Sequence, residues 1–225
     1  MPLLGFGVYQ NKGPSCVTSC LHALKVGYPH ARHIDSAIVY KNEAEVGQAV
    51  RESGIPREDI FITSKIFSRR HGYESTLKAA QRLGKIRSVG VSNYGVAHLQ
   101  EIEAEGLSPP SVNQIELHPF CQQPPIVEYC RKNSIVIQAH TPLVRGSPSD
   151  KTLLRIARDV ERSPFQICIR WCLQKGFVPL PKSANPEHIE ENADVFGFGL
   201  SKDEMEALDA LHSDTSVTWN PVKAP

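Results

Sequence analysis

Several features are missing from this sequence, and each absence argues against a class of protein. No stretch of about 18 apolar residues occurs, so no membrane-spanning helix is predicted. Charges of one sign do not run together, and the net charge of the 225 residues is only +1, which argues against a nucleic-acid-binding surface. The first ten residues lack a basic segment, so they resemble a strand rather than a secretory leader.

The cysteines lack the spacing of a metal or redox centre. The six cysteines include no C-x-x-C pair, although Cys16/Cys20 and Cys168/Cys172 are each spaced to lie on one helix face. A structural metal site needs more ligands nearby, and His22 alone does not complete one. We therefore expect buried, reduced thiols, no bound metal and a cytoplasmic protein.

Short apolar runs alternate with helix-like stretches along the whole chain, and the 40% hydrophobic and 22% charged residues are typical of a globular protein. The expected strands are Leu3–Tyr9, His33–Ala37, Ile60–Ile66, Ser88–Ser92, Val112–Leu117, Ile135–Ala139 and Phe177–Leu180. The expected helices are Ser15–Gly27, Asn42–Ser53, Tyr73–Leu83, Val96–Glu105, Pro125–Lys132, Lys151–Glu161, Pro164–Lys175, Pro186–Ala193 and one that opens with the capping box Ser201–Glu204. This alternation predicts a parallel sheet covered by helices, in a single domain over residues 1–225.

The glycine fingerprint of a dinucleotide-binding open sheet is also missing. Gly5 and Gly7 are followed by Gln10 where a third glycine is required. We therefore favour an α/β barrel of the TIM type over an open, doubly wound sheet. Seven strands are expected here, whereas a closed barrel of this type has eight, so the (α/β)8 barrel is predicted to be incomplete.

Three titratable residues follow neighbouring expected strands. Asp35 and Tyr40 lie at the end of the second strand and in the loop after it, and Lys65 lies at the end of the third. The carboxyl ends of barrel strands line the active-site face, so the three side chains can meet there. An ammonium group would lower the pKa of the tyrosine from about 10, making the trio a general acid for carbonyl reduction. Ordinary polar residues at strand ends are the alternative.

Five segments resemble motifs of the aldo-keto reductase family, in that family's order. They are residues 32–43 (RHIDSAIVYKNE), 62–65 (ITSK), 90–93 (GVSN), 112–119 (VNQIELHP) and 180–187 (LPKSANPE). The resemblance implies an (α/β)8 barrel that reduces an aldehyde or ketone with NADPH. It also implies that Asp35, Tyr40 and Lys65 are catalytic, with Tyr40 as the general acid.

The same resemblance implies residues for each part of the cofactor. Ser92, Asn93 and Gln114 would hydrogen-bond the nicotinamide carboxamide and fix which face of the ring meets the substrate. Lys182 and Ser183 would bind the 2′-phosphate, where a cation and a hydroxyl suit a dianion. Each of these residues alone could be an ordinary surface or capping residue. Because they occur together in the family's order, the resemblance supports a cofactor site.

Four further positions match the family's cofactor site less directly. Glu191 and Asn192 correspond to residues on the adenine side. His140 stands where the family commonly has a tyrosine stacked on the nicotinamide, and His188 where it often has an arginine for the 2′-phosphate. Because histidine is mostly neutral at pH 7, NADH is possible beside NADPH.

The predicted partner is a small carbonyl compound, bound by a monomeric protein. Residues 217–221 resemble the family's C-terminal substrate loop, so Trp219 is expected to line the pocket, together with Tyr9. An isolated packing aromatic is the alternative for Trp219.

One strand–helix unit of the family is absent between Ala80 and Gln81, on the order of 30–40 residues. The absent strand ends in the family's catalytic histidine, and His71 does not stand in a matching position. Loss of such a hydrogen-bond donor costs about 10²–10³ in rate. The strands on either side would either pair directly or leave a slot open.

Three interpretations therefore remain. The chain is an active carbonyl reductase, a cofactor-binding protein without efficient catalysis, or a truncated product that folds poorly.

Overall fold

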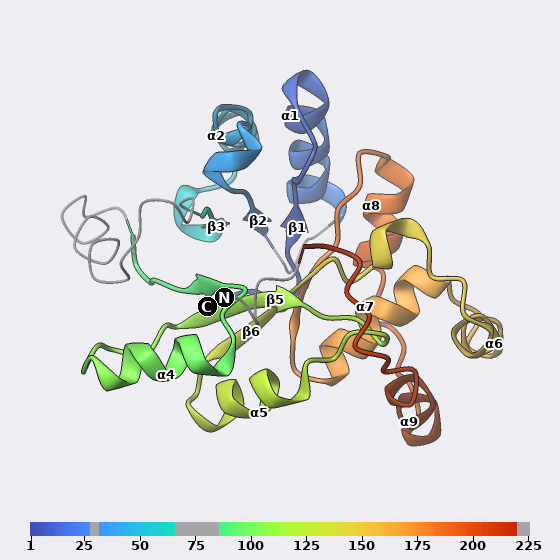
Figure 1. The fold of residues 1–225 in the computed structure, drawn as a ribbon. Helices are drawn as coiled ribbons and strands as arrows, with labels where there is room; N and C mark the ends of the chain where they lie inside the picture. The colour runs from blue at the N-terminus through green and yellow to red at the C-terminus, as the bar shows by residue number, and fades with distance from the viewer. Residues whose placement is uncertain (28–31, 66–85, 220–225) are drawn as a thin grey trace.

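The computed structural model describes residues 1–27, 32–65 and 86–219, with strands at the centre and helices around them (Figure 1). The strands are β1 (Phe6–Gly7), β2 (His33–Asp35), β3 (Phe61–Thr63), β4 (Val91–Ser92), β5 (Val112–Glu116), β6 (Val136–His140) and β7 (Val178–Leu180). The helices are α1 (Gly13–His22), α2 (Glu43–Glu52), α4 (Val96–Ala104), α5 (Pro124–Lys132), α6 (Lys151–Asp159), α7 (Pro164–Gln174), α8 (Pro186–Ala193) and α9 (Lys202–Asp209).

The strands form two parallel sheets, one in the order β1-β2-β3 and the other in the order β4-β5-β6-β7. Backbone hydrogen bonds join the two sheets where β1 meets β7, from Gly5 N–H to Pro179 O at 3.0 Å and from Gly7 N–H to Pro181 O at 2.9 Å. Among the described residues, no backbone hydrogen bond joins β3 to β4. The seven expected parallel strands are confirmed, and within the described residues β3 and β4 are not paired with each other.

Glycine is required where β1 meets β7. A Cβ atom on Gly5 would lie 2.6 Å from Leu180 Cδ2 and 2.7 Å from His33 Nδ1, and one on Gly7 would lie 3.1 Å from Leu180 O. Contacts this short would push β1 away from β7. The two glycines that do not complete a nucleotide fingerprint therefore have a packing role.

Side chains cap the last two helices at their amino ends. Ser201 Oγ accepts a hydrogen bond from Glu204 N–H, and the Glu204 carboxylate accepts one from Ser201 N–H at 2.7 Å, so the expected capping box is confirmed. Asn185 Oδ1 accepts from Glu187 N–H at 2.8 Å, and Pro186 occupies the first position of α8. The Asn185 cap fixes where α8 starts, directly after the loop that follows β7.

Two hydrophobic clusters lie between the strands and the helices. One includes residues of α1, α2 and α8 and of β1 and β2, and the other includes residues of α4 to α7, α9 and β5 to β6. Trp171 in the second cluster is fully buried, and its indole N–H donates to Asp209 Oδ1 at 2.8 Å, which ties α7 to α9. All six cysteines are buried and none forms a disulfide, as expected.

The observed elements differ from the expected ones mainly at their ends. Within the expected strand Leu3–Tyr9 only Phe6–Gly7 is a strand, because the chain turns at Gln10, which has a φ of 57°. The expected helix Ser15–Gly27 is α1 followed by a π-helical segment, Ala23–Gly27. The expected helix Tyr73–Leu83, His71 and the break between Ala80 and Gln81 lie outside the described residues.

Two features are absent from the described ranges. No helix in them is long and apolar enough to cross a membrane. The same ranges contain no group of three or more histidine, cysteine, aspartate or glutamate side chains that could hold a metal ion.

Candidate active site

Asp35 and Lys65 form an ion pair at the carboxyl ends of β2 and β3. Asp35 is the last residue of β2 and pairs in register with Thr63, so Lys65 lies just beyond it. Lys65 Nζ donates to Asp35 Oδ2 at 2.6 Å and to Ser36 O at 2.9 Å. The side chains of Lys65 and Asp35 are only 19% and 5% exposed, so the surrounding protein holds the ammonium in one place.

Tyr40 lies against the same ammonium. It belongs to the 3-10 turn Ile38–Tyr40 that follows β2, and Lys65 Nζ lies 5.3 Å from the centroid of its ring. The exposed ring of Tyr9 packs edge-on against Tyr40, with 5.1 Å between the ring centroids. The structure thus brings the three expected catalytic residues together, with Tyr9 beside them.

The pKa of Tyr40 is shifted in the direction opposite to our expectation. Burial of the ring, and secondly the charge of Asp35, raise the pKa of Tyr40 above its ordinary value. The Lys65 ammonium faces the ring and is hydrogen-bonded to Asp35 and Ser36, so it does not reverse this effect. The prediction of a pKa below the ordinary value is therefore wrong, because burial and Asp35 outweigh the ammonium, and Tyr40 is a neutral phenol at neutral pH.

Gln114 connects the second sheet to the Asp35 carboxylate. Gln114 Nε2, on β5, donates to Asp35 Oδ1 at 3.0 Å and to Gln138 Oε1 on β6 at 2.8 Å. Asp35, Gln114 and Gln138 are all buried. Asp35 therefore receives hydrogen bonds from both sheets, one from Lys65 and one from Gln114.

The other residues expected at the nicotinamide lie at the ends of β4 and β6. Ser92 Oγ donates to Gln114 O at 3.1 Å, and Asn93 follows Ser92 with a left-handed φ of 59°. His140 Nε2 lies 3.0 Å from Asn93 Oδ1, and His140 Nδ1 lies 3.0 Å from Thr141 Oγ1. Burial lowers the pKa of His140 to about 4, so at neutral pH an uncharged ring donates to Asn93 Oδ1 and accepts from Thr141.

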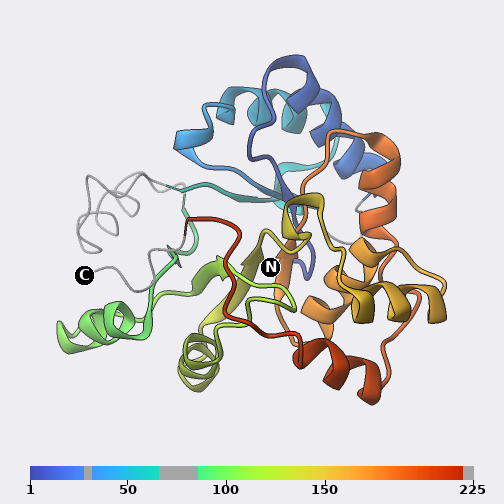
Figure 2. The same ribbon diagram turned by 45° about the vertical axis from the view of Figure 1, so that its right-hand side comes forward.

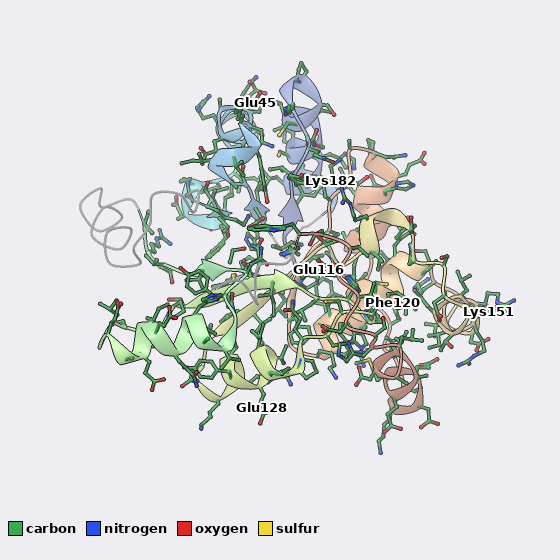
Figure 3. The ribbon with its side chains drawn as sticks, in the orientation of Figure 1. Glu45, Glu116, Phe120, Glu128, Lys151 and Lys182 are labelled. Atoms are coloured by element: carbon green, nitrogen blue, oxygen red, sulfur yellow. The ribbon has the colours of Figure 1, made fainter. Side chains whose placement is uncertain are left out.

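The residues expected at the 2′-phosphate lie after β7, at the start of α8. Lys182 is exposed, and its position is labelled in Figure 3. Ser183 Oγ accepts a hydrogen bond from Asn185 N–H at 3.1 Å, which holds the hydroxyl beside the amino end of α8. His188 is exposed on the same helix.

The residues expected on the adenine side lie further along α8. Glu191 is half-buried, and its carbonyl accepts from Gln166 Nε2 at 3.2 Å. Asn192 is only 3% exposed. That Glu191 and Asn192 contact the adenine side of the cofactor remains a prediction.

Two residues of the site were not found from the sequence. Glu116 and His118 follow Gln114 at alternate positions, and both are buried, with His118 Nε2 2.9 Å from Glu116 Oε1. Glu116 also binds the C-terminal segment just before Trp219, whose side chain is 79% exposed. Polar residues at alternate positions, Gln114 and Glu116 on β5 and His118 two residues further on, are the signal that indicates a polar interior face.

The cavity between α2 and β3 does not coincide with the candidate site. A cavity of about 260 Å³ lies between α2 and β3, lined partly by Val46, Val50 and Ile62. Tyr40 and Lys65 are not among the residues that line it. The candidate site is therefore defined by its converging side chains.

Comparison with known proteins identifies the family that has this arrangement. The family model described as Aldo/keto reductase family matches residues 71–213. The chain belongs to the aldo/keto reductase family.

Relatives of this aldo/keto reductase match nearly its whole length. An uncharacterized oxidoreductase of Schizosaccharomyces pombe is 40% identical, over 100% of this chain and 94% of the relative. The glyoxal reductase of Bacillus subtilis is 38% identical, over 98% of this chain and 92% of the relative. The solved structure of MGS-M4, an aldo-keto reductase enzyme from a Medee basin deep-sea metagenome library, is 31% identical over 98% of this chain and 94% of that one, with a TM-score of 0.90. The likeness supports the (α/β)8 barrel as the fold.

This aldo/keto reductase is shorter than the relatives that it matches. The alignment with the Schizosaccharomyces pombe protein spans 264 positions, whereas this chain has 225 residues. The relative therefore has residues without a counterpart here, which agrees with an absent strand–helix unit. That unit would be inserted between β3 and β4, which are not paired with each other in the described part of the chain.

Proposed function

We propose that this protein reduces an aldehyde or ketone to an alcohol by hydride transfer from NADPH, with Tyr40 as the general acid. The observation that supports the proposal is the Lys65 ammonium, held 2.6 Å from Asp35 and 5.3 Å from the centroid of the Tyr40 ring. NADPH, when bound, would supply the hydride that attacks the carbonyl carbon. Tyr40 would transfer its hydroxyl proton to the carbonyl oxygen, giving the alcohol.

The environment of Tyr40 suits donation of its hydroxyl proton to the substrate. The raised pKa of Tyr40 keeps the phenol protonated at neutral pH, so the acid form is present before the reaction. Once the proton leaves, the phenolate would lie beside the Lys65 ammonium, which stabilises the new negative charge. Asp35 holds that ammonium in place through its bond at 2.6 Å.

The described residues also fit a nicotinamide cofactor. The Asn93 amide is oriented by His140 and lies next to Ser92 and Gln114, a set of donors and acceptors suited to a carboxamide. Lys182 and Ser183 lie at the amino end of α8, where a cation, a hydroxyl and backbone N–H groups favour a phosphate. We therefore propose NADPH as the cofactor, with NADH as the weaker choice because His188 replaces a permanent cation.

The decisive experiment compares wild type with Tyr40→Phe. We expect the purified protein to oxidise NADPH, followed by absorbance, when an aromatic aldehyde is added. Tyr40→Phe should lose this turnover and still bind NADPH. Tyr129→Phe serves as the control because, among the described residues, its hydroxyl donates to the exposed Glu103 carboxylate, at 3.0 Å, and to no other group. Equal turnover in Tyr40→Phe and wild type would contradict the role of Tyr40.

A second candidate function is cofactor binding without efficient turnover. The shorter chain favours it, because the resemblance to the family implies that the absent strand–helix unit carries the catalytic histidine. Quenching of NADPH fluorescence without oxidation would support this candidate. A melting temperature that rises with NADPH would also separate both candidates from a poorly folded product, since a ligand stabilises only a state that binds it.

Three coarser predictions remain for experiment. The disulfide-free, buried cysteines support a cytoplasmic location, which fractionation would test. A monomer is predicted, and sedimentation would test it. A single domain over residues 1–225 predicts one cooperative unfolding transition.

A further inference from the structure

Asn42 is a completely buried amide at the amino end of α2. In that position an asparagine side chain ordinarily accepts a hydrogen bond from an N–H group of the first helical turn. Within the described chain Asn42 makes no side-chain bond of this kind, and only its backbone carbonyl serves the helix, accepting from Val46 N–H at 3.1 Å. The side-chain amide is therefore available for contacts outside α2.

The amide of Asn42 joins the loops that follow β1 and β2. Its Nδ2 donates to Val8 O and to Asn11 O, each at 2.8 Å. Its Oδ1 accepts from Ser36 Oγ, also at 2.8 Å. Asn11 and Ser36 are buried as well, so water does not readily replace these partners. Both donor hydrogens and the acceptor oxygen of one side chain thus hold the two loops together.

The same two loops carry the aromatic rings of the candidate site. Tyr9 directly follows Val8, and Tyr40 lies two residues before Asn42. The two rings pack edge-on, with 5.1 Å between their centroids, although Tyr9 is 52% exposed. Because about half of Tyr9 faces solvent, the place of its ring depends on the backbone that carries it. The bonds from Asn42 to Val8 and Asn11 fix that backbone.

Ser36 connects the same amide to the Lys65 ammonium. The Ser36 hydroxyl donates to Asn42, whereas the Ser36 carbonyl accepts from Lys65 Nζ at 2.9 Å. Lys65 Nζ in turn lies 5.3 Å from the centroid of the Tyr40 ring. Both neighbours of the Tyr40 ring, Tyr9 and Lys65, are therefore connected through this one amide.

The first turn of α2 makes two further contacts with neighbouring loops, both less buried. Glu45, labelled on α2 in Figure 3, accepts from Gly13 N–H at 3.3 Å at the start of α1, and Figures 1 and 2 show α1 and α2 side by side. Ser64 Oγ, at the end of β3, donates to Glu43 Oε1 at 2.5 Å. Glu43 is exposed and Glu45 is half-buried, so solvent competes least with the bonds of Asn42.

We propose that Asn42 is a positioning residue that holds the Tyr40 ring against Tyr9 and Lys65 and thereby sets the orientation of the proton donor. Displacement of a reacting group by about 1 Å can lower a rate about a hundredfold, so contacts that fix the donor contribute to kcat. The catalytic part of the inference rests on the proposed carbonyl reduction, whereas the ring contact itself does not.

The ring contact is tested by nuclear Overhauser cross-peaks between Tyr9 and Tyr40, which need no turnover. Asn42→Ala removes all three side-chain bonds, and Asn42→Asp keeps the oxygen that accepts from Ser36 but loses the N–H₂ group. We expect the cross-peaks in wild type and their loss in both variants, because the Tyr9 loop is then no longer bound to α2. Ser36→Ala leaves both bonds of the N–H₂ group in place and should keep the cross-peaks.

Gln174→Ala is the matched control, because the Gln174 amide also makes three hydrogen bonds with described residues. It donates to Leu200 O at 2.9 Å and accepts from Leu200 N–H at 2.7 Å and from Arg170 Nε at 2.9 Å. The change removes as many bonds at the end of α7, where no residue of the candidate site takes part. The cross-peaks, kcat and the Kd of NADPH should therefore equal those of wild type.

The effect on catalysis is tested by comparing kcat with the Kd of NADPH. In Asn42→Ala we expect kcat to fall about tenfold or more. The Kd of NADPH, measured by fluorescence, should stay at the wild-type value, because Asn93 and Lys182 are unchanged. A protein that merely folds less well would instead show fewer binding sites and an unchanged kcat for each site.

A double-mutant cycle tests whether Asn42 acts through Ser36. Ser36→Ala removes one hydrogen bond of about 1 kcal/mol, so we expect a roughly fivefold lower kcat. Because this variant loses a single bond, it also keeps the test available if Asn42→Ala does not fold. The double variant N42A/S36A should be no slower than Asn42→Ala, since both changes break the same bond.

Four outcomes would overturn the inference. The cross-peaks survive in both Asn42 variants, Gln174→Ala loses them too, kcat for each bound NADPH is the same in Asn42→Ala and wild type, or the double variant is slower than Asn42→Ala. If wild type binds NADPH and shows the cross-peaks but reduces no aldehyde, the proposed function fails and the positioning of the Tyr40 ring by Asn42 stands.

Discussion

Gln114 Nε2 lies 3.0 Å from Asp35 Oδ1, and this hydrogen bond joins the four-stranded sheet to the three-stranded sheet across the barrel interior. Asp35 accepts it while its other oxygen binds Lys65 at 2.6 Å. Gln114, which the sequence predicts to contact the cofactor, therefore also positions the proposed catalytic carboxylate.

Replacing Gln114 with leucine should weaken both folding and catalysis. The change removes a hydrogen bond to a buried carboxylate, which is worth about 2 kcal/mol. Urea denaturation should show a loss of that size, with a lower kcat. Gln48→Leu is the control, because Gln48 bonds only the exposed Glu52 carboxylate on α2, and it should change stability by less than about 0.5 kcal/mol.

Carbonyl reduction should be insensitive to pH over the neutral range. Burial and Asp35 raise the pKa of Tyr40, so the phenol that donates the proton remains protonated. Activity is lost only as pH rises through that pKa, which lies above the ordinary value of about 10. A kcat profile that is flat from about pH 6 to about pH 9 is expected, and a fall centred near pH 7 would contradict this prediction.

His140→Phe should weaken cofactor binding while the fold is retained. The ring of His140 orients the Asn93 amide through a contact of 3.0 Å, and phenylalanine keeps a ring without that donor. Loss of one neutral hydrogen bond of about 1 kcal/mol corresponds to a roughly fivefold higher Kd for NADPH. A fluorescence titration would measure it, and an unchanged Kd would show that the contact with Asn93 is irrelevant to binding.

Mild acid should destabilise the protein through two histidines. Burial lowers the pKa of both His33 and His140 to about 4, whereas in the unfolded chain a histidine has a pKa of about 6.5. The unfolded state therefore binds more protons, so this stability is present above about pH 6.5 and is lost as pH falls toward 4. Denaturation between pH 7 and pH 4 should show uptake of about two protons on unfolding. His33→Gln should reduce the uptake to about one, and the exposed His188→Gln serves as the control.

The alternation of apolar runs was sufficient to predict the strands that hold the site. Asp35 and Lys65 could be placed because each closely follows an apolar run, and the carboxyl ends of neighbouring parallel strands meet. The direction of the Tyr40 pKa could not be predicted. It depends on whether the ammonium faces the hydroxyl or the ring, and spacing along the chain does not contain that information.

The hydrogen bonds of Glu116 could not be predicted from the sequence for a different reason. Its partners Ser216 and Thr218 come from a segment without periodicity, about a hundred residues further along the chain. Only the tertiary fold brings them together. The position of Glu116 in a largely buried strand indicates a hydrogen-bond acceptor in the interior. It does not indicate that Ser216 and Thr218 are the donors.

The candidate site is divided between the two sheets. Asp35, Tyr40 and Lys65 stand on the three-stranded half, and Ser92, Asn93 and His140 stand on the four-stranded half. Within the described residues, the backbone hydrogen bonds between β1 and β7 and the Gln114–Asp35 hydrogen bond join the two halves. The distance between the proposed proton donor and the proposed nicotinamide groups therefore depends on how firmly the two sheets are held together.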